Sequence, residues 1–130
     1  MVTENNKKRI LAIDDEPIIS RVSTRVLKAD GFEVDVAGNG LVAKAMAAKV
    51  EYDLYLCDIR MPEMNGMEFY EYLRKAHPGY ESRVIFVSGD TMNHEVKTFL
   101  SDKNNLFLMK PFTPEELRIV IRKALKQRGK

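Results

Sequence analysis

The stretch Ile10-Leu11-Ala12-Ile13-Asp14-Asp15-Glu16, an apolar run followed at once by three acids, decides the fold. Four consecutive apolar residues without polar alternation are typical of a strand that is buried on both faces, as in a parallel sheet. Comparable short runs recur four times along the chain, over residues 32–37, 54–57, 84–87 and 106–109. The sequence therefore predicts five short strands in a parallel sheet.

Stretches with helical spacing separate these runs. In the first, apolar residues recur every three to four positions from Ile18 to Leu27, and Gly31 follows as a helix stop. Thr113-Pro114-Glu115-Glu116 supplies an N-cap, a proline at the first helical position and a capping-box glutamate for the last helix. The other three helices are predicted over about 41–50, from Gly66 to before Pro78, and over about 92–100. This alternation predicts an α/β fold, a three-layer, doubly wound (βα)5 sheet with helices on both faces.

Length and composition fit one globular domain. The chain has 130 residues, of which 45% are hydrophobic and 31% charged, and a net charge of +2, too small to indicate a nucleic-acid or membrane surface. The single cysteine, Cys57, excludes an internal disulfide and suits a reducing compartment such as the cytoplasm. No apolar run is long enough for a membrane span, and the start does not resemble a signal peptide. We expect a disordered lead-in over 1–8, a domain over 9–127 and a tail over 128–130.

Polar residues with a shared chemistry follow four of the predicted strands. Asp14 and Asp15 follow the first, Asp58 the third, Ser88 the fourth and Lys110 the fifth. Ligands of such sheets bind at the carboxyl ends of the strands, so these side chains are expected to converge. Clustered carboxylates favour Mg²⁺, and a lysine suits phosphoryl oxygens. The pattern predicts a phosphoryl-transfer pocket with an aspartate as nucleophile.

This set of motifs resembles the response-regulator receiver family of two-component signalling, and especially its chemotaxis-type members. The motifs are Asp14-Asp15, the segment Asp58-Ile59-Arg60-Met61-Pro62-Glu63-Met64-Asn65-Gly66, Ser88-Gly89 and Lys110-Pro111-Phe112. The likeness runs from about residue 8 to residue 126, with the motifs in the family's order. It implies a flavodoxin-like sheet with strand order 2-1-3-4-5, and a cis bond before Pro111.

The resemblance also implies a role for each matching residue. Asp58 matches the phosphoacceptor, and Lys110 and Ser88 match the lysine and the hydroxyl that contact the phosphoryl group. Mg²⁺ would be the cofactor. Its ligands would be Asp14, Asp15, Asp58 and the backbone carbonyl of Arg60. Ser88 and Phe107 match the pair of residues that switch conformation on phosphorylation.

The function that the resemblance implies is phosphorelay signal transduction. A sensor histidine kinase or a histidine phosphotransfer protein would supply the phosphoryl group. The domain would catalyse only its own phosphorylation and dephosphorylation, and so would be a switch and not an enzyme acting on other molecules. Its responsive surface would be residues 91–127, through which a partner or a second copy would bind. The chain by itself would contact neither nucleic acid nor membrane, and the cytoplasm is the expected compartment.

Three other classes of protein share part of this pattern. An aspartyl-phosphate phosphohydrolase generally has an acid two residues after its nucleophile, where this chain has Arg60. A flavodoxin-type flavin module would need hydroxyls and amides after the first strand, where Asp15 and Glu16 would repel a flavin phosphate. A DNA-binding regulator remains open for a longer protein, although nothing after residue 126 could form a helix-turn-helix.

Several of these residues also have simpler interpretations. Asp14 or Asp15 could cap the first helix, and Phe107 could be a core aromatic. Arg60 and Asp90 each lie two residues after a pocket residue. We hypothesise that they pair across the mouth of the pocket and slow hydrolysis of the acyl phosphate.

Overall fold

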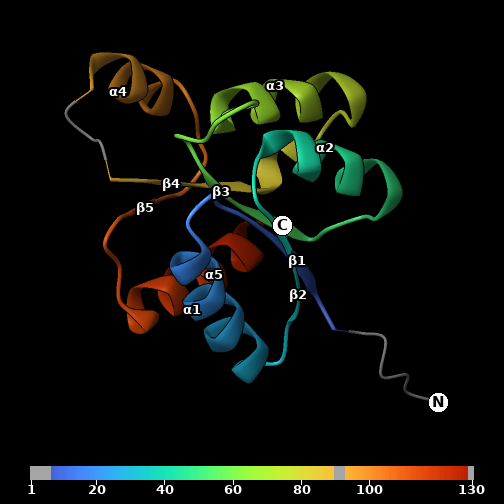
Figure 1. The fold of residues 1–130 in the computed structure, drawn as a ribbon, viewed down its shortest axis with the longest axis vertical. Coiled ribbons are helices and arrows are strands. Elements are labelled where there is room, and N and C mark those ends of the chain that lie inside the picture. Colours follow the sequence, from blue (N-terminus) through green and yellow to red (C-terminus); the bar gives the residue numbers. More distant parts are fainter. Residues whose placement is uncertain (1–6, 90–92, 129–130) are drawn as a thin grey trace.

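The computed structural model describes residues 7–89 and 93–128 (Figure 1). Strand and helix alternate along the chain, with one additional 3₁₀ helix, η2. The strands are β1 (Arg9–Ile13), β2 (Glu33–Ala37), β3 (Leu54–Asp58), β4 (Val84–Ser88) and β5 (Phe107–Met109). The helices are α1 (Pro17–Ala29), α2 (Gly40–Lys49), α3 (Gly66–Ala76), η2 (Tyr80–Arg83), α4 (His94–Ser101) and α5 (Pro114–Arg128).

The five strands form one parallel sheet in the order β2-β1-β3-β4-β5. The fold class and strand order expected from the sequence are thereby confirmed. Residue pairs run in register across the central strands, so that Ile13 pairs with Cys57 on β3 and Cys57 pairs with Phe86 on β4. All five residues of β3 and of β4 are buried, which explains the apolar runs without polar alternation.

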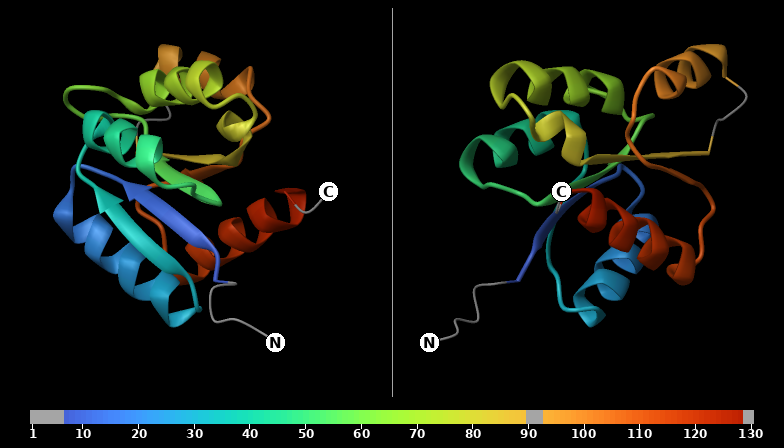
Figure 2. Two further views of the ribbon diagram at one scale, coloured as in Figure 1. Left: turned by 90° about the vertical axis from the view of Figure 1, so that its right-hand side faces the viewer. Right: turned by 180° about the vertical axis from the view of Figure 1, so that it is seen from behind.

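The sheet is covered on both faces, and each face has its own apolar core. Helices α2, α3 and α4 lie on one side and α1 and α5 on the other (Figures 1 and 2). The first core centres on aromatic side chains such as Tyr55, Phe69 and Phe86, and the second on aliphatic ones such as Leu27 and Ile121. This packing is the three-layer arrangement that the alternation predicts.

Helix ends follow the signals in the sequence. Gly31, with φ of +96°, lies just past α1, in the left-handed region that glycine occupies without strain. The capping box of α5 is formed, because Thr113 Oγ1 accepts from the Glu116 backbone and a Glu116 carboxylate oxygen accepts from the Thr113 N–H. A second capping box, between Asn65 and Glu68, begins α3. Helix α5 extends through Arg128, and residues 1–6 of the expected lead-in and 129–130 of the expected tail lie outside the described ranges.

Two close backbone approaches fix the loop after β3. A Cβ on Gly66 would lie 2.5 Å from the carbonyl oxygen of Asp58, and a Cβ on Gly40 would lie 2.2 Å from that of Met64. Both distances are shorter than any real Cβ contact, so only glycine fits at either position. Asp58 is held at the carboxyl end of β3 by this loop. The peptide bond before Pro111 is cis, as expected from the resemblance.

Candidate functional site

Lys110 is the centre of a cluster of carboxylates at the carboxyl ends of the strands. Its ammonium lies 3.0 Å from Asp14 Oδ2, 3.0 Å from Asp58 Oδ2 and 2.6 Å from Glu16 Oε1. β1, β3 and β5 lead directly into Asp14, Asp58 and Lys110 respectively, so the sheet alone brings these three together. Asp14 and Asp58 are 7% and 5% exposed, which places both carboxylates inside the protein surface.

Burial controls the protonation of this cluster. It raises the pKa of Asp58 to about 6, against the opposing hydrogen bond from Lys110 and with support from the charge of Asp14. Burial likewise raises the pKa of Asp14, although the backbone N–H of Glu16 and the Lys110 ammonium both oppose the rise. Burial alone would lower the pKa of Lys110, but hydrogen bonds to the three carboxylates raise it above its ordinary value. Two buried carboxylates, Asp14 and Asp58, and the exposed carboxylate of Glu16 thus surround one ammonium.

Ser88 lies at the end of β4 and is 1% exposed. Its carbonyl oxygen accepts from the backbone N–H of Lys110 across 2.9 Å. On the other side of β4, the N–H of Ile59 donates to the carbonyl of Val87 across 2.9 Å. The backbones that carry Asp58, Ser88 and Lys110 are thus joined by direct hydrogen bonds.

Asp15 and Arg60 lie at the edge of the site. Asp15 is exposed, and its carboxylate is not among the clustered ligand atoms of the described residues. It lines a surface pocket together with Arg60 and Asn65, next to the loop after β3. The backbone N–H of Arg60 donates to Asp58 Oδ1 over a long 3.4 Å. Asp90, the expected partner of the Arg60 side chain, lies outside the described residues, so the Arg60–Asp90 pair stays a prediction.

Phe107 begins β5, directly opposite Phe86 in the register of the sheet. It is half-buried and packs at the edge of the α2–α3–α4 core. Both a core role and a switch role are compatible with that position. The same core anchors α4 through Phe99, whose ring meets that of Phe86 edge-on, with centroids 5.1 Å apart.

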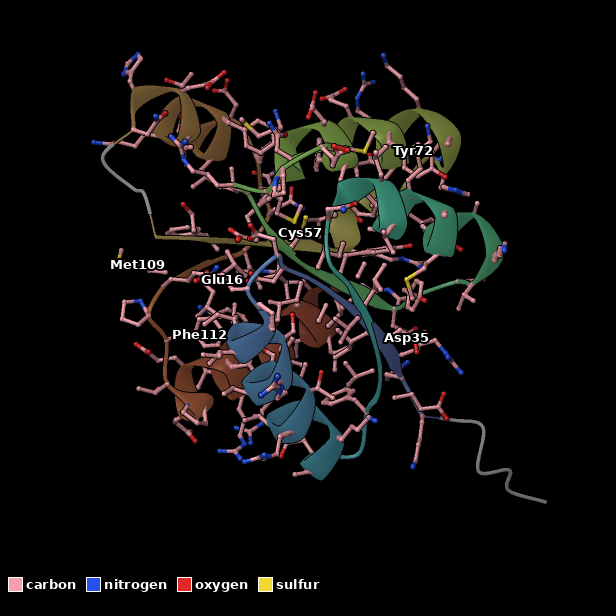
Figure 3. The ribbon with its side chains drawn as sticks, in the orientation of Figure 1. Glu16, Asp35, Cys57, Tyr72, Met109 and Phe112 are labelled. Carbon is pink, nitrogen blue, oxygen red and sulfur yellow. The ribbon has the colours of Figure 1, made fainter. Side chains whose placement is uncertain are left out.

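Glu16 is a site residue to which the sequence assigned no role. It precedes α1, and its side chain, labelled in Figure 3, contacts the Lys110 ammonium. Asp14, for its part, does not cap the helix: its Oδ1 accepts from the backbone N–H of Glu16 across 2.9 Å, before the helix begins. The only available signal was the third consecutive acid after β1.

The donor set fits a hard divalent cation. One carboxylate oxygen each from Asp14, Glu16 and Asp58 lies within 4.8 Å of the others. Oxygen ligands are those that Mg²⁺ prefers, and it commonly uses one or two carboxylates with water completing the shell. Burial and, to a smaller extent, the charge of Asp14 raise the pKa of Asp58, and a divalent ion would offset the charge repulsion.

Comparisons with known proteins all point to the same family. The family model of the response regulator receiver domain matches residues 10–122 of this chain. The DNA-binding response regulator MtrA of Mycolicibacterium smegmatis is 33% identical over 93% of this chain and 52% of its own length. The transcription factor SKN7 of Saccharomyces cerevisiae is 31% identical over 98% of this chain and 20% of its own. The chain thus spans about half the length of the first relative and a fifth of the second.

Solved structures share the fold. A CheY-like response regulator receiver domain protein from Methanospirillum hungatei superposes with a TM-score of 0.86 at 30% identity, covering 95% of this chain and 98% of that one. The response regulator TrrA of Thermotoga maritima, solved in complex with Mg²⁺ and BeF, gives a TM-score of 0.76 at 30% identity, covering 90% of this chain and 98% of that one.

Among the helices of the described ranges, none is long and apolar enough to cross a bilayer.

Proposed function

This chain belongs to the family of response regulator receiver domains, the aspartate-phosphorylated switches of two-component signalling, and on that premise we propose that Asp58 accepts the phosphoryl group. The observation that carries the assignment is the contact between Asp58 Oδ2 and the Lys110 ammonium, 3.0 Å apart inside an acidic cluster. Asp58 is the carboxylate at the end of the central strand β3, with a neighbouring strand on each side. Incoming phosphoryl oxygens would therefore meet the side chains of both neighbouring strand ends.

The proposed transfer uses the position of Asp58 next to Lys110. A carboxylate oxygen of Asp58 attacks the phosphorus of a phosphohistidine, the new P–O bond forms, and the P–N bond breaks with its electron pair leaving on the imidazole. Lys110 shifts its contact from Asp58 to a phosphoryl oxygen and balances the charge that collects there. Hydrolysis by the domain itself reverses the state: water attacks phosphorus, the P–O bond to Asp58 breaks, and phosphate leaves.

Mg²⁺ is the proposed cofactor, held by Asp14, Asp15, Asp58 and the backbone carbonyl of Arg60. The clustering of carboxylate oxygens supports Asp14 and Asp58 as ligands, and it adds Glu16 as a competing or additional ligand. When bound, the ion neutralises charge on the phosphoryl oxygens. The chain's own acids orient it: Asp14 is fixed by its bond to the Glu16 backbone, and Asp58 by the loop that Gly66 permits.

Ser88 and Phe107 are the proposed switch residues. Ser88 is buried beside the site, and its backbone is bonded to that of Lys110. A hydroxyl that turns toward the phosphoryl group would vacate space in β4, and Phe107 would turn inward to fill it. The result would be a population shift of α4, β5 and α5, within residues 91–127, of which 91 and 92 lie outside the described ranges.

Receiver domains interact with histidine kinases or phosphotransfer proteins, and we propose one of these as the cytoplasmic phosphodonor. The output partner would dock on the switched surface, and a second copy of this chain is one candidate for it. Relatives that bind DNA do so as longer proteins, since this chain spans about half of MtrA. We propose no direct nucleic-acid contact by the receiver itself, and none with membrane.

The test is phosphorylation by a small donor. The purified chain is incubated with acetyl phosphate and Mg²⁺, and its intact mass is compared with that of Asp58→Asn. We expect one phosphoryl group on the parent, none without Mg²⁺ and none on the variant. Asp53→Asn, at the opposite ends of the strands, is the matched control and should be phosphorylated normally. A phosphorylated Asp58→Asn would overturn the assignment, and beryllofluoride binding would separate rapid hydrolysis from a failure to react.

A further inference from the structure

Helix α1 contains three buried hydroxyl groups that have no hydrogen-bond partner among the described residues. They are Ser20 Oγ, Ser23 Oγ and Thr24 Oγ1. Ser20 is 7% and Ser23 is 1% exposed, so bulk water does not reach either side chain freely. A buried hydroxyl without a partner is costly, and native proteins nearly always satisfy it through protein groups or an ordered water. The receiver function described above gives these hydroxyls no role.

Ser20 and Ser23 line one small cavity below the acidic cluster. Asp14 lines the same cavity, and these three are its polar residues. The remaining walls are apolar and come from β1, β3, β4, α1 and Phe112, which follows β5 and is labelled in Figure 3. The cavity has room for about one water molecule. Thr24 does not line it, and instead faces an open groove between α1 and β2, which Ser20 and Asp14 also line from their other side.

Asp14 has acceptor capacity left for a contact from this side. Its Oδ1 accepts from the Glu16 backbone, and its Oδ2 faces the Lys110 ammonium. An ionised carboxylate can accept about four hydrogen bonds, so each oxygen can take one more. An ordered water typically makes about three hydrogen bonds, which is the number of polar residues around the cavity.

We infer that this cavity is a binding site for a single ordered water molecule that joins Ser20, Ser23 and Asp14. The water donates to the Asp14 carboxylate and bonds to the two serine hydroxyls. It connects α1 to a residue of the acidic cluster through the interior of the protein. Ser20 and Ser23 are then positioning residues, which hold the carboxylate of Asp14 through this water from the side that faces the cavity.

A high-resolution crystal structure of the parent chain tests the site directly. We expect one well-ordered water peak within hydrogen-bond distance of both serine hydroxyls and of Asp14. A serine in a helix can also turn its hydroxyl to the carbonyl four residues earlier, here that of Glu16 or Ile19. Both hydroxyls turned to those carbonyls around a dry cavity would overturn the inference.

Stability tests whether the Ser23 hydroxyl has a hydrogen-bond partner at all, and the crystal structure then distinguishes the water from the Ile19 carbonyl. If water satisfies the hydroxyl, Ser23→Ala removes a hydrogen bond and lowers the unfolding midpoint by roughly 2–5 °C. If the hydroxyl is unsatisfied, the same change removes a buried polar group and raises the midpoint. Thr24→Val, which deletes the hydroxyl outside the cavity, is the matched control and should not lower it. A raised midpoint in Ser23→Ala would overturn the inference.

The positioning role rests on the proposed Mg²⁺ site and has its own measurement. We expect Ser20→Ala to weaken Mg²⁺ binding several-fold by calorimetry, whereas Thr24→Val leaves it unchanged. Unchanged affinity in Ser20→Ala would overturn the positioning role. Failure of the parent to bind Mg²⁺ would instead overturn the proposed metal site, a result distinct from the crystallographic search for the water.

Discussion

The backbone N–H of Lys110 donates to the carbonyl oxygen of Ser88 across 2.9 Å, while the ammonium of the same lysine contacts the buried Asp58. One residue therefore ties the end of β5 to the end of β4 and also balances the charge at the end of β3. When the Lys110 ammonium changes its charge partner, the effect reaches Ser88 directly, because the Lys110 backbone is hydrogen-bonded to this proposed switch residue.

Replacing the ammonium of Lys110 should destabilise the metal-free protein. The side chain is 13% exposed and faces three carboxylates, so Lys110→Met leaves buried anions without their cation. We expect a loss of roughly 2–4 kcal/mol in the free energy of unfolding by urea titration, and most of it should return with Mg²⁺. The exposed Lys97→Met is the matched control and should change stability by less than about 0.5 kcal/mol. Equal effects of the two substitutions would contradict the charge argument.

Metal-free protein should lose stability as the pH rises through about 6, and Asp58 is the reason. Burial raises its pKa from 3.8 to about 6, so the folded state holds a proton that the unfolded chain releases. For a raised pKa the stabilisation is complete below about pH 4 and is lost as the pH passes the folded value. The difference between the folded and the ordinary pKa of Asp58 corresponds to at most about 3 kcal/mol of stability. Urea titrations in EDTA at several pH values measure it.

Asp58→Asn is the variant that isolates the contribution of Asp58 to the pH dependence of stability. Without an ionisable group at that position, the variant should be more stable than the parent at pH 7.5 in EDTA, and the gap should close toward pH 4. Mg²⁺ should stabilise the parent more than the variant. If the two proteins lose stability in parallel between pH 4 and 7.5, the slope belongs to other groups.

Much of the fold could be predicted because its signals are local. The apolar runs located every strand to within a residue or two, and the Thr113–Glu116 capping box located the start of α5. The convergence of Asp14, Asp58 and Lys110 followed from parallel strands ending at one edge. The 3₁₀ helix η2 was not predicted, since four residues are too few to show a period.

The details of the acidic site could not be predicted in the same way. Beyond the end of β1, side chains no longer point to alternate faces of the sheet, so strand geometry does not say where each acid points. The three consecutive acids also have equivalent chemistry. The family resemblance assigned Asp15 to the metal ion, whereas the structure brings Glu16 to Lys110 and leaves Asp15 exposed at the rim. Which of the two binds a metal ion stays a prediction. The hydroxyls of α1 also escaped notice, because burial inside a helix face depends on its packing.

The loop after β3 should not tolerate a side chain at Gly66. A Cβ there would lie 2.5 Å from the Asp58 carbonyl, so Gly66→Ala must displace the backbone of the proposed phosphoacceptor. We expect a loss of about 1–3 kcal/mol in stability and at least a tenfold slower phosphorylation by acetyl phosphate. Gly38→Ala is the control, because nothing lies within 4 Å of its added Cβ. Normal phosphorylation kinetics in Gly66→Ala would show that the loop is not needed to position Asp58.

The opposite ends of the strands carry a separate, acid-sensitive clamp. Asp53 accepts from the backbone N–H of Arg9 and from the Arg128 guanidinium, both across 2.8 Å, and Arg128 lies at the end of α5. Burial would raise the pKa of Asp53, but these two hydrogen bonds lower it below its ordinary value. For a lowered pKa the stabilisation is present above about pH 4 and is lost as the pH falls through the folded value.

Asp53→Asn should therefore lose about 1 kcal/mol at pH 7 and match the parent more closely near pH 3. Arg128→Met should lose a similar amount, and the double variant should lose less than the sum, because the two side chains form one contact. Arg122→Met, exposed on the same helix, is the control. None of these changes should alter phosphorylation of Asp58, since the clamp lies at the other ends of the strands. Strictly additive losses, or a pH-independent effect of Asp53→Asn, would mean that packing and not the ion pair holds the end of α5.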